Sequence, residues 1–220
     1  MMIATQGQND AEMKDTMERM YRFTRHIYDA SRKYYLLGRD KAIAGLKAQP
    51  GEAICEVGCG TARNLVKMAD AYPEAQFYGI DISDEMLKTA RKNIGDKSIS
   101  VAQGFAQNFN PATTFGLTKP FDKIVFSYAL SIIPPWRESF DHALALLPSG
   151  GEIHIIDFGS QSGLPAPFRK FLFWWLKQFH VFYKPEIEAH LRQLAREGSG
   201  TLSFESLHGG YCNRAVFTKA

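Results

Sequence analysis

The central part of the chain alternates between short apolar runs and longer stretches with helical spacing. Five apolar runs have the length of buried strands, namely residues 53–57, 76–82, 98–103, 121–130 and 152–158. Three of the intervening stretches place their apolar residues on one side of a helix, namely residues 64–72, 85–94 and 137–147. Strands and helices in alternation predict a parallel sheet with helices on both faces.

The last third of the chain departs from this alternation. An apolar insertion occupies residues 160–185, and residues 185–197 predict a helix. Two more strands are predicted at 201–206 and 211–217, and the Gly-rich turn between them suits an antiparallel hairpin. The whole pattern predicts an α/β fold, with a Rossmann-like, seven-stranded, mostly parallel sheet that ends in an antiparallel C-terminal hairpin.

The N-terminal region precedes every predicted strand. Residues 10–36 predict a long helix, and residues 41–48 predict a short one, which the Gln-Pro-Gly run after it ends. We expect residues 1–48 to form a helical lid on the sheet. Because 220 residues provide one sizeable core and not two, we expect a single domain over residues 1–220.

Charge and cysteine content narrow the partners and the location. The net charge is only +3, but basic residues crowd 19–47 and 169–184 among aromatic residues, which indicates an anionic partner. The three cysteines and six histidines show no metal-ligand spacing, so we expect reduced thiols and no metal. Neither a signal peptide nor a spanning segment is recognisable, which predicts a cytoplasmic protein, with or without peripheral contact at the inner face of the membrane. The oligomeric state stays open.

The strongest chemical signal is a glycine-rich turn after the first predicted strand, which contains Glu56, Gly58, Cys59 and Gly60. Its glycines allow a tight turn and let bare backbone approach a ligand. A Gly-x-Gly pair alone is a weak motif. Here an acid stands shortly before the glycines, where nicotinamide-binding fingerprints usually have an apolar residue. In addition, Asp81 ends the next strand, where a carboxylate can bond both ribose hydroxyls.

This Glu-x-Gly-x-Gly pattern with its acid-terminated strand resembles the class I S-adenosylmethionine-dependent methyltransferases, and the resemblance covers residues 51–158. It implies S-adenosylmethionine as the cofactor. By this resemblance, Glu56 and the backbone of residues 58–60 hold the methionine part, and Asp81 holds the ribose. Ile82, next to Asp81, is included among the expected cofactor-binding residues.

The third predicted strand ends in a departure from the pattern of that family. The family often has Gly-Asp-Ala here, with the Asp bonding the adenine amine, whereas this chain has Gly104, Phe105 and Ala106. Phe105 is either a core residue or a stacking partner for adenine. The bond to adenine would then come from Gln103, Gln107 or the backbone of Ala106.

Residues at the carboxyl ends of the fourth and fifth strands are expected to face the methyl donor and acceptor, because open α/β sheets bind ligands at that edge. Ser127 and Tyr128 end a run that is similar to the family's fourth-strand motif. Asp157 ends the fifth strand. It is either a catalytic carboxylate or a carboxylate that caps a helix or loop.

The acceptor is suggested by residues 26–40, HIYDASRKYYLLGRD. This run resembles the betaine-lipid N-methyltransferases, which convert diacylglyceryl-homoserine to its trimethylated betaine, and the resemblance implies a lipid amine as substrate. Candidates for an aromatic cage around the sulfonium and the product ammonium are then Tyr28, Tyr34, Tyr35 and Tyr128. Arg32 is a candidate for binding the homoserine carboxylate. For each of these residues a packing or surface role is the alternative.

The apolar insertion is the other unusual segment. Its aromatic and aliphatic residues recur at helical spacing, and Arg169, Lys170 and Lys177 fall between them. Such a helix suits the surface of an anionic membrane, where it would make peripheral contact. A helix in the core or in a dimer interface is the alternative.

The two resemblances together imply an S-adenosylmethionine-dependent N-methyltransferase for the amino group of a lipid headgroup. The alternatives are a methyltransferase for a soluble small molecule, a quinone precursor or another phospholipid amine, and a cofactor-binding module without catalysis. Nucleic acid is not expected as a partner, because no RNA-binding module and no Asn-Pro-Pro-Tyr-like run is recognisable.

Overall fold

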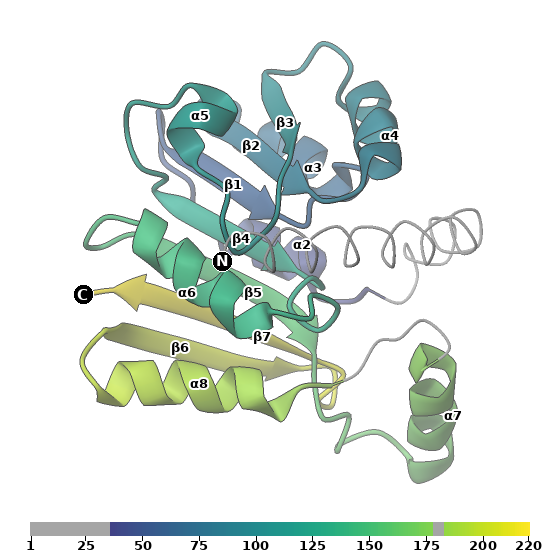
Figure 1. The fold of residues 1–220 in the computed structure, drawn as a ribbon. Coiled ribbons are helices and arrows are strands. Elements are labelled where there is room, and N and C mark those ends of the chain that lie inside the picture. The colour runs from purple at the N-terminus through teal and green to yellow at the C-terminus, as the bar shows by residue number, and fades with distance from the viewer. Residues whose placement is uncertain (1–35, 178–182) are drawn as a thin grey trace, which may run out of the picture.

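The computed structural model describes residues 36–177 and 183–220, which form a seven-stranded sheet with helices on both faces (Figure 1). The strands are β1 (Ala53–Val57), β2 (Gln76–Asp81), β3 (Ile99–Gln103), β4 (Lys123–Ser127), β5 (Glu152–Phe158), β6 (Gly200–Leu207) and β7 (Cys212–Lys219). The helices are α2 (Arg39–Ala44), α3 (Arg63–Ala71), α4 (Asp84–Ile94), α5 (Pro111–Phe115), α6 (Trp136–Leu146), α7 (Ala166–Lys177) and α8 (Pro185–Arg196).

The sheet follows the order β3-β2-β1-β4-β5-β7-β6. The first five strands pair in parallel, and β7 pairs antiparallel with both β5 and β6. This confirms the predicted mostly parallel sheet with its antiparallel hairpin. The register aligns the ends of the central strands, because Val57 on β1 lies beside Ile80 on β2 and Phe126 on β4. The loops that follow these strands therefore meet at one edge.

Each face of the sheet has its own hydrophobic core. On one face Leu65 of α3 and Leu87 of α4 are fully buried in a cluster with strand residues such as Ile54. On the other face Phe140 of α6 and Leu191 of α8 are buried in a larger cluster, and Figure 1 shows these two helices side by side in front of the sheet. Burying a side chain of this size contributes about 1.5–3 kcal/mol. The two cores hold the strands, and thus the edge where the loops meet, in place.

A third hydrophobic cluster lies at the carboxyl edge of the sheet. It joins Leu36, which precedes α2, with Tyr128 after β4 and with Leu172 and Leu176 of α7. All four side chains are less than a tenth exposed. This cluster therefore connects the end of the N-terminal region and the insertion to the loop that follows β4.

Three elements differ from the sequence-based expectations. Helix α2 begins two residues earlier than predicted and ends four residues earlier, at Ala44. Gly45 caps this end, and its N–H donates to the carbonyl of Lys41. Helix α5 was not predicted, although Asn110 caps its start by accepting from the N–H groups of Ala112 and Thr113. Its five residues are too short to show helical periodicity. The helix predicted at 10–36 lies almost entirely outside the described residues.

Candidate active site

The turn after β1 needs glycine for its conformation and for its contacts. Gly58 and Gly60 both have a positive φ, of 74° and 53°, a region that glycine enters at little cost. The N–H groups of Gly58 and Cys59 both donate to the carbonyl of Ile80 at 2.9 Å, which fastens the turn across the end of β2. A Cβ on Gly58 would lie 3.1 Å from the Cβ of Ala129. The turn therefore brings bare backbone to the edge where β1, β2 and β4 end.

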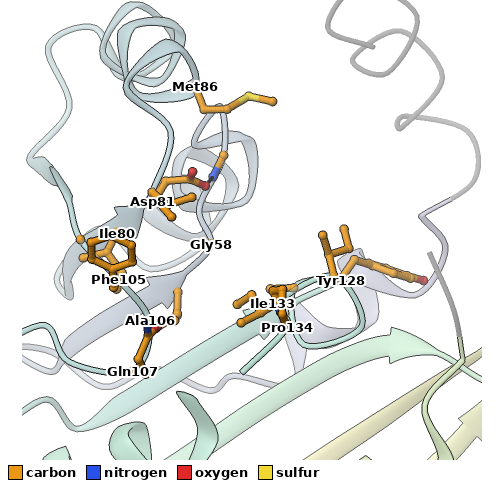
Figure 2. Close-up of a pocket in the computed structure, with 16 residues that line it drawn as sticks. Gly58, Ile80, Asp81, Met86, Phe105, Ala106, Gln107, Tyr128, Ile133 and Pro134 are labelled. Atoms are coloured by element: carbon orange, nitrogen blue, oxygen red, sulfur yellow. Dashed lines mark hydrogen bonds between the residues drawn. The ribbon is translucent and has the colours of Figure 1, made fainter. Parts of the chain in front are cut away.

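Asp81 is the last residue of β2 and is held by backbone on both sides. Its Oδ2 accepts from the N–H of Gly60 at 2.8 Å, and its Oδ1 accepts from the N–H of Ser83 at 2.9 Å. The side chain is buried, yet it lines the cavity that opens beside it (Figure 2). Because each carboxylate oxygen can accept more than one hydrogen bond, Asp81 can also accept from ligand hydroxyls in the geometry that these N–H groups fix.

A cavity of about 690 Å³, which we call the main cavity, lies at this edge of the sheet. Figure 2 shows the ends of β2 and β3 on one side of it and the loop after β4 on the other. It is lined by Val57, Gly58, Gly60, Ile80, Asp81, Ile82, Met86, Gly104, Phe105, Ala106, Gln107, Tyr128, Ala129, Ile132, Ile133 and Pro134.

A second, smaller space of about 400 Å³, the polar recess, adjoins the main cavity, and Gly58 lines both. Its charged lining residues are Arg39, Glu56 and Arg63. Glu56 is buried, and its Oε1 accepts from the side-chain amide of Asn64 at 2.7 Å. The recess thus brings one carboxylate and two guanidinium groups to the other side of the glycine turn.

The residues predicted to bind the cofactor divide between these two spaces. The main cavity receives Gly58, Gly60, Asp81, Ile82, Gly104, Phe105 and Ala106. The polar recess receives Glu56, Cys59 and Ser127, along with Gly58. Several lining residues carried no motif that would identify them in the sequence, namely Met86, Ile132, Ile133 and Pro134, and Arg39 was part of the run 26–40 but was not expected at the cofactor.

The residues predicted to be catalytic are only partly brought to the cavity. Tyr128 lines the main cavity, whereas Tyr28, Arg32, Tyr34 and Tyr35 lie outside the described residues. Asp157, expected at the same edge, does not line the main cavity, because β5 directs its side chain into the layer beneath the loop after β4. Among residues 36–177 and 183–220, no group of His, Cys, Asp and Glu could hold a metal ion.

Two titratable side chains in these spaces are unsuited to proton transfer at neutral pH. Burial raises the pKa of the Cys59 thiol well above its usual value, so the thiol stays neutral and the residue contributes mainly backbone. Burial likewise raises the pKa of Tyr128, whose hydroxyl donates to the carbonyl of Leu37 at 2.5 Å. Tyr128 therefore offers the cavity its ring and not an acid or base.

The loop after β4 forms one wall of the main cavity and is held from behind by two charged side chains. Asp157 accepts from the N–H of Ser131 at 2.9 Å, which supports the loop-capping interpretation of this carboxylate. Lys184 donates to the carbonyls of Leu130 and Ile133 at 3.0 and 3.1 Å. Burial raises the pKa of Asp157 and lowers that of Lys184, and each charge favours the ionised form of the other. Backbone of the wall is thus fixed by groups that do not themselves face the cavity.

We expect Lys184→Met to impair the acceptor side of the site more than the cofactor side. The change leaves two loop carbonyls without their donor, so the wall that contains Ile133 shifts, and displacements near 1 Å can cost about 100-fold in rate. Steady-state kinetics should show kcat/KM for the acceptor falling by about 10- to 100-fold, with less than a twofold change in cofactor affinity.

Lys219→Met is the matched control for this variant. Lys219 also donates to two carbonyls, those of Leu144 and Leu147, but at the opposite edge of the sheet. It should lower the melting temperature without this selective loss. Equal kinetic effects of the two variants would contradict the assigned role of Lys184.

Comparison with known proteins adds family relationships to this geometry. A family model described as a methyltransferase domain matches residues 48–192. Malonyl-[acyl-carrier protein] O-methyltransferase 1 of Ilyobacter polytropus is 30% identical over 110 residues, which are 50% of this chain and 39% of that protein. Demethylmenaquinone methyltransferase of Desulfitobacterium hafniense is 27% identical over 124 residues, which are 54% of this chain and 47% of that protein. The chain spans about half the length, or less, of these two relatives.

Solved structures share the fold at low sequence identity. The plantazolicin methyltransferase BpumL, solved in complex with S-adenosylhomocysteine, superposes with a TM-score of 0.68 at 15% identity, covering 97% of this chain and 99% of that one. A possible histamine N-methyltransferase from Thermotoga maritima gives a TM-score of 0.64 at 18% identity, and the match covers 93% of this chain and 100% of that one. The matched residues 48–192 contain every residue that lines the main cavity. The chain therefore belongs to the methyltransferase-domain family, and its fold is that of the class I S-adenosylmethionine-dependent methyltransferases.

Proposed function

We propose that this protein transfers a methyl group from S-adenosylmethionine to the amino group of a lipid headgroup, acting from the cytoplasmic side at the membrane surface. The observation that carries the methyltransferase part is the joint placement of Gly58, Gly60 and Asp81 around one cavity at the carboxyl edge of the sheet. That edge is where open α/β folds bind their ligands. The family to which the chain belongs supports the same reaction class.

The two adjoining spaces suit the two ends of the cofactor. We expect Asp81 to bond the ribose hydroxyls, and Phe105 and Gln107, which line the same cavity, to contact the adenine. The polar recess suits the methionine end, because Glu56 complements an ammonium group and the guanidinium of Arg39 complements a carboxylate. The sulfonium then lies near Gly58, where the two spaces meet.

The chemistry of the main cavity favours an amine as the acceptor. Among the described residues that line it, only Asp81 and Tyr128 are titratable. Asp81 is bound by two backbone N–H groups, and Tyr128 donates to Leu37 and has a raised pKa, so neither is placed as a general base. Methyl transfer to a neutral amine needs alignment and an existing lone pair, with no proton removed by the enzyme beforehand.

The lipid nature of the acceptor is supported by the apolar wall and by the N-terminal sequence. Ile133 and Pro134 lie across the cavity from Asp81 (Figure 2), and Ile132 lines the cavity as well. Residues 26–40 resemble the betaine-lipid N-methyltransferases, which names diacylglyceryl-homoserine as the acceptor and trimethylation as the outcome. Relatives named demethylmenaquinone methyltransferases favour a quinone precursor as the second candidate.

Labelled methyl transfer tests this proposal. The purified protein is incubated with methyl-labelled S-adenosylmethionine and, in separate reactions, with diacylglyceryl-homoserine, phosphatidylethanolamine and demethylmenaquinone in mixed micelles. We expect label in mono-, di- and trimethylated products of the homoserine lipid. Label only in the quinone would replace the amine by the second candidate, and no label in any lipid would overturn the lipid acceptor.

A further inference from the structure

We infer that α7 is a docking helix for an anionic membrane surface, and that it binds through the side that bears Lys170, Phe171, Phe173 and Trp174, which we call the outer face of α7. This inference goes beyond the proposed methyl transfer, since binding to a membrane does not depend on that reaction.

The two sides of α7 have different surroundings although both are apolar. Leu172 and Leu176 are 6% and 3% exposed and belong to the cluster at the carboxyl edge. Phe171, Phe173 and Trp174 are instead 57%, 40% and 60% exposed. They account for three of the four large apolar side chains that are exposed within residues 36–177 and 183–220. Concentration of such side chains on one helix marks an interaction surface.

Charge on this segment selects the kind of partner. Residues 159–184 contain no Asp or Glu, and their basic residues are Arg169, Lys170, Lys177 and Lys184. Lys170 is exposed beside the aromatic side chains, whereas Lys184 is engaged with the loop after β4. A basic segment without acidic residues of its own attracts an anionic partner. Two copies of the chain that met through this face would bring like charges together, so a second copy fits less well.

The dimensions and residue types of α7 fit the plane of a membrane. Twelve residues of helix extend about 18 Å, and within the described part of the chain no helix is long and apolar enough to cross a bilayer. Tryptophan and phenylalanine favour the boundary between headgroups and acyl chains, and lysine binds the anionic headgroups above it. The outer face of α7 presents both kinds of side chain together.

The position of α7 places such a membrane close to the main cavity. The helix follows the carboxyl end of β5, and Figure 1 shows it set apart from α6 and α8 at the edge where β1, β4 and β5 end. Its buried residues share one cluster with Tyr128, which lines the main cavity. The buried side of α7 is therefore joined to the wall of the cavity through one hydrophobic cluster. Docking through this face would bring a headgroup within reach of that wall.

Vesicle sedimentation tests this inference with the full-length protein. Vesicles of 30% phosphatidylglycerol in phosphatidylcholine are compared with vesicles of phosphatidylcholine alone. We expect the wild type to pellet with the anionic vesicles, and 0.5 M salt to weaken this binding at least fivefold, because ionic screening shortens the reach of lysine and arginine. Replacing Phe171 and Trp174 by Ser should lower the partition coefficient at least tenfold.

Matched variants separate this role from folding and from net charge. Phe171→Leu with Trp174→Phe keeps the apolar character and should retain most of the binding. Lys170→Gln with Arg169→Gln should reduce binding to anionic vesicles, whereas Arg91→Gln with Lys92→Gln removes the same charge from exposed positions on α4 and should bind as the wild type does. Melting curves show that each variant is folded.

Three outcomes would overturn the inference. The first is that the wild type does not bind anionic vesicles, and the second is that the variant with Ser at 171 and 174 binds them unchanged. The third is that this variant changes from dimer to monomer, which would show that a second copy covers the face. Calorimetric titration with S-adenosylmethionine, without vesicles, keeps the proposed function separate. Normal cofactor binding without vesicle binding overturns only the docking helix, whereas vesicle binding without cofactor binding overturns only the methyltransferase.

Discussion

Asp81→Asn should lower the affinity for S-adenosylmethionine by about 30- to 150-fold while the protein remains folded. A charge-assisted contact that is lost from a buried site costs about 2–3 kcal/mol, and each 1.4 kcal/mol is about a factor of ten in affinity. The asparagine oxygen can still accept from the N–H of Gly60 or of Ser83, so one of the two backbone hydrogen bonds of this side chain is kept. Titration calorimetry measures the affinity, and circular dichroism checks the fold.

Asp96→Asn is the matched control, because Asp96 is exposed after α4 and lies away from the cavity. It should bind S-adenosylmethionine as the wild type does. Unchanged affinity in a folded Asp81→Asn protein would remove Asp81 from the cofactor site.

Deletion of residues 2–35 should leave a folded protein that binds the cofactor more weakly and transfers no detectable methyl group. The deletion removes Tyr28, Arg32 and Tyr34, which are expected to bind the acceptor. It stops before Leu36 because the structure makes that residue part of a buried cluster, and because the next carbonyl, that of Leu37, accepts from Tyr128. A cut at Asp40 would also remove these contacts and confuse loss of binding with loss of stability.

Labelled methyl transfer and a melting curve, measured on the same preparation, decide the outcome of this deletion. Arg32→Ala in the full-length chain adds a finer test. Its KM for a carboxylate-bearing acceptor should rise about 10- to 100-fold, as expected when a charged hydrogen bond worth about 1.5–3 kcal/mol is lost, and Arg32→Lys should recover part of that loss. Full activity of the shortened protein would show that the acceptor is bound by other residues.

The fold could be predicted from the sequence because each strand left a local signal. Residues 53–57 are buried at every position, and their mostly apolar run predicted both ends of β1 correctly. Helix α5 was not predicted, because five residues are too few to show helical periodicity, although Asn110 and Gly116 cap its two ends. The end of α2 before Gly45 was not predicted, because the residues on both sides of this glycine follow a helical pattern.

The candidate site was predicted where backbone geometry determines residue type. The glycines of the turn and Asp81 were recognisable because a tight turn and a strand end restrict what can stand there. Ile132 and Pro134 were not, because any apolar side chain can line a cavity wall. The sequence alone could not decide between the catalytic and the capping role of Asp157. Its partner Ser131 is 26 residues away in the chain, and only the fold brings the two together.

Calorimetric titration of the wild type with S-adenosylmethionine tests the central claim most directly, with Gly58→Val and Gly51→Val as companions. The wild type should bind one molecule per chain, and Gly58→Val should bind none, because its side chain would meet Ala129 at the turn. Gly51 also has a positive φ, of 80°, but a Cβ there meets no atom within 4 Å, so Gly51→Val carries similar backbone strain away from the cavity and should still bind. No binding by the wild type, or equal binding by Gly58→Val, would contradict the account.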